Sequence, residues 1–161
     1  MQEPSKPAGL LAEDGARVLD LTIVNFLEAT ISFPLLFILF YSAEGADHSI
    51  ALQGNFSAAA YQLHEQRIPA RLGKFEVRED WPEGRMFANR LGVQELPDIK
   101  VFRYGMPSEY QAGAGTVDLV DVARWNAGNL DLGMSAAADR SYPAALQRPT
   151  TAVHDVEGTA G

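Results

Sequence analysis

The residues with the most reactive side chains gather in one short segment, Glu44-Gly45-Ala46-Asp47-His48-Ser49. An aspartate, a histidine and a serine are the members of a hydrolytic triad, in which the serine attacks and the histidine moves the proton. Triads are assembled by tertiary geometry, however, and direct neighbours in sequence rarely face one another as the reaction requires. The segment therefore gives only weak support to a hydrolase.

The same segment offers ligands for a metal ion, because carboxylates and imidazole bind divalent cations. Glu44, Asp47 and His48 could supply them, but the other two of the three histidines stand in a predicted helix and near the C-terminus. We therefore expect no metal and no other cofactor. The simpler interpretation is that Asp47 or Ser49 caps a helix, whose first turn attracts acidic groups.

The composition excludes several classes of function. The 161 residues contain no cysteine, so disulfides, thiolate metal sites and thiol redox chemistry are ruled out together for this chain. The net charge is −8 and the 13 lysines and arginines are scattered, which disfavours a nucleic-acid-binding face. The most apolar run, Ile31 to Tyr41, has about 11 residues against roughly 20 needed to cross a bilayer, so no transmembrane segment is predicted.

Hydrophobic patterning predicts alternating strands and helices around the Glu44–Ser49 segment. The continuous apolar run Leu35–Tyr41 is typical of a strand covered on both faces. Gly54 is a weak point in the helix that follows. We expect five strands, at 18–21, 35–41, 71–77, 98–104 and 108–111, with a turn at 105–107 between the last two. We also expect four helices: one that starts at Thr22 or Asn25, one at 49–66, one from Pro82 to near Gly92, and one at 116–126. The order β-α-β-α-β-α-β-β-α predicts an α/β fold with a mixed central sheet and helices on both faces.

The chain divides into three parts. Residues 17–127 are expected to form one domain, 1–16 an N-terminal arm and 128–161 an extended C-terminal tail. The tail is rich in Ala, Gly, Pro, Ser and Thr, and its apolar residues stand singly, so it cannot bury enough surface to fold alone. We therefore expect the two arms to contact other protein subunits.

Four segments resemble the protein disulfide isomerase family. Phe40 to Leu52 resembles its active-site stretch, Phe-Tyr-Ala-Pro-Trp-Cys-Gly-His-Cys-Lys-Ala-Leu. Leu91-Gly92-Val93 and Leu96 to Phe102 resemble its Tyr-Gly-Val and Tyr-Pro-Thr-Ile-Lys-Phe-Phe segments, and Gly105 to Tyr110 its Gly-Lys-Pro-Ser-Glu-Tyr turn and strand. The resemblance covers roughly Val18 to Trp125 and implies a thioredoxin fold.

The resemblance fails where the family does its chemistry. Thiol–disulfide exchange needs a thiolate nucleophile and a second thiol that resolves the mixed disulfide, and the chain has neither. The family's buried proton-transfer glutamate aligns with Leu39, although its partner Lys74 remains. The resemblance therefore implies a redox-inactive domain.

The resemblance also directs attention to Pro97. The family's proline at this position is cis and exposes backbone that pairs with substrate peptides, so Leu96 and Pro97 are candidate peptide-binding residues. The alternative is that Pro97 only shapes the loop before the next strand. Trp81 and Tyr142 are candidate interface residues, because a tryptophan in a polar stretch can anchor a partner.

We therefore expect a non-catalytic structural or binding subunit of a larger protein assembly. The alternative is a chaperone-like module that binds peptides in a groove beside Pro97, and an enzyme acting through the His48 loop is the least supported interpretation. The resemblance suggests an organelle or endomembrane lumen, and the cytoplasm remains open because residues 1–7 contain no apolar signal-peptide core.

Overall fold

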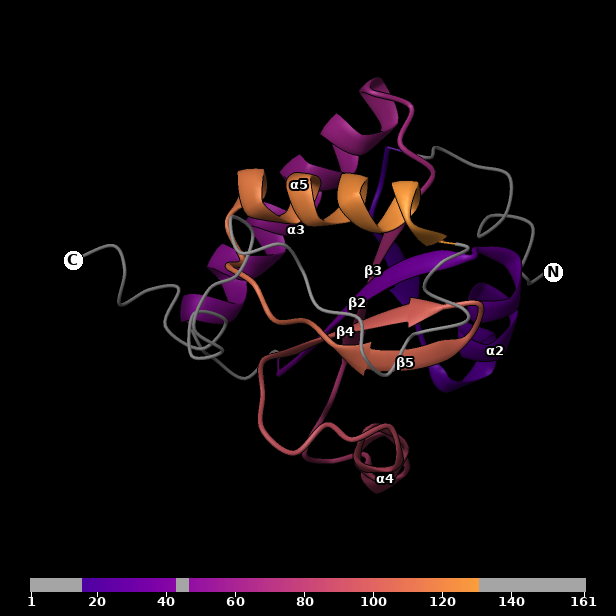
Figure 1. Ribbon diagram of the computed structural model, residues 1–161. Coiled ribbons are helices and arrows are strands. Elements are labelled where there is room, and N and C mark those ends of the chain that lie inside the picture. Colours follow the sequence, from indigo (N-terminus) through magenta and orange to yellow (C-terminus); the bar gives the residue numbers. More distant parts are fainter. Residues whose placement is uncertain (1–15, 43–46, 131–161) are drawn as a thin grey trace, which may run out of the picture.

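The computed structural model describes residues 16–42 and 47–130 (Figure 1). The elements follow one another in the predicted order of strands and helices. They are β1 (Leu19–Leu21), α2 (Ile23–Ser32), β2 (Leu35–Tyr41), α3 (Asp47–Glu65), β3 (Arg71–Glu76), α4 (Pro82–Arg90), β4 (Asp98–Arg103), β5 (Met106–Glu109) and α5 (Thr116–Gly128).

The five strands form one mixed sheet in the order β1-β3-β2-β4-β5. β3 runs parallel to both β1 and β2, while β4 is antiparallel to β2 and to β5. β2 lies at the centre, and all seven of its residues are buried. The apolar run Leu35–Tyr41 is therefore a strand covered on both faces, as its composition predicts.

Helices cover both faces of the sheet (Figure 1). Side chains alternate along β2, so Leu35, Phe37 and Leu39 pack with α3 and α5, whereas Leu36, Ile38 and Phe40 pack with α2 and α4. The two apolar clusters on either side of the sheet together form the core.

The first helix begins as the sequence predicts. Thr22 is the N-cap of α2, and its side chain accepts a hydrogen bond from the Val24 N–H at 3.2 Å. The Asn25 side chain accepts one from the Thr22 N–H at 2.8 Å. Both predicted starting residues therefore take part in one capping box.

The structure corrects two local predictions. The helix expected from Ser49 begins at Asp47, so Ser49 is a buried residue of the first turn and not its cap. The hairpin turn is formed by Tyr104 and Gly105, with φ of 51° and 81°, a pairing suited to a two-residue loop. Met106 and Pro107 already belong to β5, because an edge strand tolerates proline.

The other boundaries agree with those predicted to within two residues, and β2 has the predicted bounds. α5 continues to Gly128, and Leu130 packs against the core beside α3 and α5. In the part of the chain that the structure describes, no helix has the length and apolar character needed to cross a membrane.

Candidate functional site

The segment with the reactive side chains, residues 44–49, follows β2 and includes the first three residues of α3. Glu44, Gly45 and Ala46 lie outside the described residues, as does Tyr142. Asp47 and His48 begin α3, but their side chains are not described. The structure thus places the ends of this loop, and the roles expected for its side chains stay predictions.

The loop that carries Leu96 and Pro97 lies beside the same end of β2. The Leu96–Pro97 peptide bond is cis. In the antiparallel register Asp98 is opposite Phe40, so one residue further along Pro97 is level with Tyr41. The Pro97 side chain is buried, and Leu96 is half-buried against the core beside α2 and α4. The fold thus brings this loop next to the end of β2 that precedes the Glu44–Ser49 segment, while peptide binding there stays a prediction.

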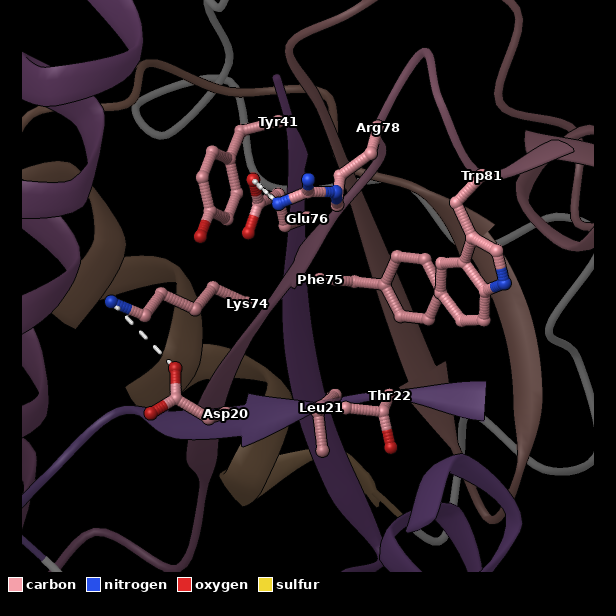
Figure 2. A pocket seen from close by; sticks show the side chains of 9 residues that line it. All are labelled: Asp20, Leu21, Thr22, Tyr41, Lys74, Phe75, Glu76, Arg78 and Trp81. Carbon is pink, nitrogen blue, oxygen red and sulfur yellow. Dashed lines mark ion pairs between the residues drawn. The ribbon is translucent and has the colours of Figure 1, made fainter. Parts of the chain in front are cut away.

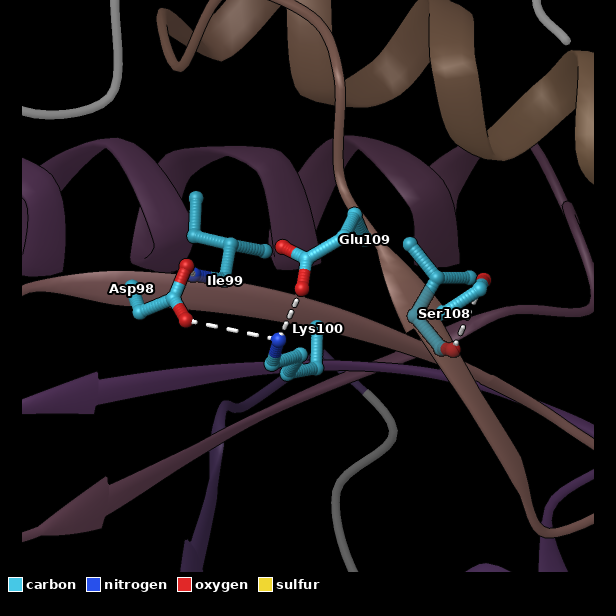
Figure 3. Close-up of polar contacts among 6 residues, drawn as sticks. Asp98, Ile99, Lys100, Ser108 and Glu109 are labelled. Carbon is cyan, nitrogen blue, oxygen red and sulfur yellow. Dashed lines mark hydrogen bonds and ion pairs between the residues drawn. The ribbon is translucent and has the colours of Figure 1, made fainter. Parts of the chain in front are cut away.

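A buried lysine supports the strand that follows Pro97 (Figure 3). The Lys100 side chain is 3% exposed, and its Nζ lies 3.6 Å from Oδ2 of Asp98 and forms an ion pair with Glu109. Oδ1 of Asp98 accepts a hydrogen bond from the Ile99 N–H at 2.9 Å. Gly92 has φ of 92°, and a side-chain carbon there would lie 3.3 Å from Lys100 Nζ. This cluster could not be predicted from the sequence, because Asp98 and Glu109 come together only through strand pairing.

Leu39 is fully buried at the position where the resemblance expects a proton-transfer glutamate. Its register partner on β3 is Lys74, whose ammonium lies 3.4 Å from Oε1 of Gln53 and 3.7 Å from Oδ1 of Asp20. The retained lysine therefore interacts with polar groups on α3 and β1, next to an apolar neighbour on β2.

A cavity of about 310 Å³ opens at the carboxyl ends of β1 and β3 (Figure 2). Such ends are where open α/β sheets place their ligands. Trp81, the predicted interface residue, forms one wall, and the indole packs over Gly84, where an added side-chain carbon would lie 2.8 Å from its Cε3. The lining residues are Asp20, Leu21, Thr22, Tyr41, Lys74, Phe75, Glu76, Arg78 and Trp81.

Ion pairs organise the rim of this cavity. Arg78 donates to both carboxylate oxygens of Asp80 at 3.0 and 2.9 Å and lies 3.8 Å from Glu76. Its hydrogen bonds to Asp80 hold the pKa of that carboxyl below its usual value. Burial raises the pKa of the Tyr41 phenol, and the negative charges of Glu76 and Asp20 raise it further.

Metal binding finds no support in the described part of the chain. Across residues 16–42 and 47–130, no three histidine or carboxylate side chains gather as ligands would. Glu44 lies outside these ranges and the side chains of Asp47 and His48 are not described, so a metal site in that loop is not tested.

Comparisons with known proteins agree with the fold described above. No family model matches the chain. A protein disulfide-isomerase of Drosophila melanogaster is 32% identical over 116 residues, covering 72% of this chain and 22% of the relative. A protein disulfide-isomerase of Gallus gallus is 36% identical over 111 residues, covering 67% of this chain and 20% of the relative. The first thioredoxin domain of mouse protein disulfide-isomerase A4 superposes with a TM-score of 0.61 at 18% identity, covering 88% of this chain and 91% of that domain.

The chain contains a thioredoxin-like domain of the protein disulfide isomerase family. The thioredoxin fold expected from the four matching segments is confirmed. This thioredoxin-like domain lacks the active-site cysteines, because the whole sequence contains none. The chain spans about a fifth of the length of the curated relatives it matches.

Proposed function

We propose that this thioredoxin-like domain is redox-inactive and acts as a non-catalytic structural or binding subunit of a larger protein assembly. The observation that carries the proposal is the burial of Leu39 beside Lys74 in an intact fold. An apolar side chain at this position cannot accept a proton, and a chain without cysteine has no thiolate to attack a disulfide. The remaining functions are those that need only a folded surface, such as binding another protein.

The outer face of α2 supports a binding role. Val24, Leu27 and Ile31 are 92%, 69% and 73% exposed and stand at helical spacing, so they line one face. Grouped exposed aliphatic side chains are typical of protein contact surfaces. The two terminal arms are the other proposed contact segments, and they lie largely outside the described residues.

Affinity purification of the native protein, followed by crosslinking mass spectrometry, tests this proposal. We expect stoichiometric partner proteins that crosslink to residues 1–16 or 128–161. A protein recovered alone, or with many substoichiometric unfolded proteins, would contradict the proposal.

A matched pair of variants tests the α2 surface in the same experiment. Leu27→Gln on α2 is expected to reduce partner recovery. Ile50→Gln on α3 removes an aliphatic side chain of nearly equal exposure, 68% against 69%, and is expected to leave recovery unchanged. Equal recovery with both variants would show that α2 makes no partner contact.

A second candidate function is peptide binding beside Pro97. It is favoured by the β2–β4 register, which aligns Pro97 with Tyr41 at the end of β2 that precedes the Glu44–Ser49 segment. This function predicts that the purified protein slows the aggregation of denatured client proteins. A protein that leaves client aggregation unchanged would eliminate this second candidate.

A further inference from the structure

The cavity beside Trp81 has two chemically different halves. Side chains alternate across a strand, so Lys74 and Glu76 lie on one face of β3 and Phe75 on the other. Figure 2 shows the same division: Asp20, Tyr41, Lys74 and Glu76 lie to one side, and Leu21, Phe75 and Trp81 to the other. An occupant that fits both halves must be apolar along part of its length and polar at one end.

The polar half is electrically negative. Its carboxylates come from Asp20, which is 84% exposed, and Glu76, which is 33% exposed. Both cations that line the cavity have carboxylate partners: Lys74 lies 3.7 Å from Asp20, and Arg78 binds both oxygens of Asp80 and lies 3.8 Å from Glu76. These three carboxylates outnumber the two cations, so one negative charge is left over. Burial is the main cause of the raised Tyr41 pKa, and the negative charges of Glu76 and Asp20 raise it further, in agreement with this sign. A cationic occupant would therefore be favoured over an anionic one.

We propose that this cavity binds a lysine or arginine side chain of the partner polypeptide. The aliphatic stem would lie against Leu21 and Phe75, and the charged head would reach Asp20 and Glu76. Trp81 supplies an aromatic wall on the same side of the cavity as the aliphatic stem. The inference rests on the proposed binding function, because it names the chemistry of the partner.

Other occupants fit less well. An anion would compete with Asp80 for Arg78 and with Asp20 for Lys74. A purely apolar side chain would fill the half formed by Leu21, Phe75 and Trp81 and would leave the carboxylates in water without a new partner. The net charge of −8 also favours approach by a basic partner.

The first experiment titrates the full chain with N-acetyl-arginine amide. The chain has two tryptophans, so a Trp125→Phe background leaves Trp81 as the fluorescent probe inside the cavity. We expect saturable quenching of Trp81 with a dissociation constant on the order of 1 mM, weakened by added salt. N-acetyl-citrulline amide, which has nearly the same shape without the charge, should bind at least about threefold more weakly.

Two outcomes of the titration would overturn the proposal. Equal quenching by the arginine and citrulline amides would show that charge plays no part. Tighter binding of N-acetyl-glutamate amide would show that the cavity takes anions. Both comparisons use one protein, the Trp125→Phe background with an unaltered cavity, so they do not depend on a change to any lining residue.

Variants of the lining residues then locate the bound side chain. Asp20→Asn and Glu76→Gln should each lower the affinity for the arginine amide by about threefold. Asp121→Asn removes an exposed carboxylate on α5 that pairs with Arg124, and should leave the affinity unchanged. Equal affinities in all three variants would place the ligand elsewhere.

The same variants separate this inference from the proposed function. If partner proteins are recovered equally with Asp20→Asn, Glu76→Gln and Asp121→Asn, the subunit role stands and the basic-side-chain site is wrong. If no partner is recovered with the unaltered chain while the arginine amide still binds, the subunit role fails and the cavity retains its specificity.

Discussion

Leu39 and Lys74 are register partners across β2 and β3, and both side chains lie on the sheet face covered by α3 and α5. Leu39 is fully buried, whereas the Lys74 side chain is 29% exposed and reaches Gln53 and Asp20. The position next to the lysine thus contributes packing instead of proton transfer. The first prediction follows from this pair.

Replacing the leucine by the acid that the resemblance expects should destabilise the domain. Leu39→Glu puts a carboxyl group into an apolar site, and we expect a loss of about 2–4 kcal/mol in the free energy of unfolding at pH 8. Burial raises the folded pKa of the new carboxyl above its unfolded value of about 4.3. The loss should therefore be smallest below that pH and grow as the pH rises through the folded pKa.

Denaturant unfolding at pH 5 and pH 8 measures this effect. The double variant Leu39→Glu/Lys74→Met should lose more stability than the sum of the two single changes, because the new carboxylate then lacks its neighbouring cation. Additive losses would mean that Lys74 does not interact with a carboxylate at position 39.

Gly54 offers a stabilising change. It is exposed in the middle of α3, and a side-chain carbon added there would have no atom within 4 Å. Gly54→Ala should raise the free energy of unfolding by about 1 kcal/mol and the Tm by about 4 °C. Thermal unfolding followed by circular dichroism checks this.

Gly73→Ala is the contrasting control for that prediction. Its new carbon would lie 2.8 Å from Cδ1 of Leu21 and 3.6 Å from the Leu19 carbonyl oxygen, so the substitution should lower stability by about 1–3 kcal/mol. A rise in Tm for both variants would contradict the packing between β1 and β3.

The Lys100 cluster should be sensitive to removal of its cation. Lys100→Met leaves the carboxylates of Asp98 and Glu109 close together without the ammonium between them. We therefore expect the free energy of unfolding to fall by about 2 kcal/mol. Glu109→Gln should cost less than about 1 kcal/mol, because Glu109 is 59% exposed and Asp98 still pairs with the lysine. Guanidinium unfolding measures both variants, and equal losses of unfolding free energy in Lys100→Met and Glu109→Gln would rule out the lysine as the centre of the cluster.

Tyr41 should report the charge around the cavity through its alkaline titration. Its pKa is raised above 10.0 by burial and then by Glu76 and Asp20, so Glu76→Gln should lower it. Because the folded pKa is the higher one, the contribution of Tyr41 to stability is complete below about pH 10 and is lost as the pH rises through the folded pKa. Ultraviolet absorbance of tyrosinate, with Tyr41→Phe used to identify the signal among the five tyrosines, measures the shift.

Asp121→Asn is the charge control for the Tyr41 titration, because Asp121 lies on α5 and does not contribute to the Tyr41 pKa shift. A Tyr41 pKa that moves equally in Glu76→Gln and Asp121→Asn would mean that only the net charge of the chain matters.

The candidate site was only partly predictable. Trp81 was singled out as a possible interface residue from its polar neighbours, and it does line the cavity. Asp20 and Tyr41 were read only as members of strands, because nothing in their own segments marks them as ligand-binding. The hairpin turn was misplaced since Gly105-Met106-Pro107 has the composition of a turn, while the β4–β5 register assigns Met106 and Pro107 to the strand.

The amino-acid sequence alone determined the order of the elements, the buried central strand and the impossibility of cysteine chemistry in this chain. These are local or compositional properties: periodicity sets which face of a strand or helix is apolar, and a missing residue type is missing in any fold. Only the tertiary structure decided which side chains meet. Asp20, Lys74 and Trp81 come from separate segments, and they share one cavity because parallel pairing of β1 with β3 aligns the carboxyl ends of both strands. Pairing register and strand order depend on the packing of the whole core, and no short stretch of sequence specifies them.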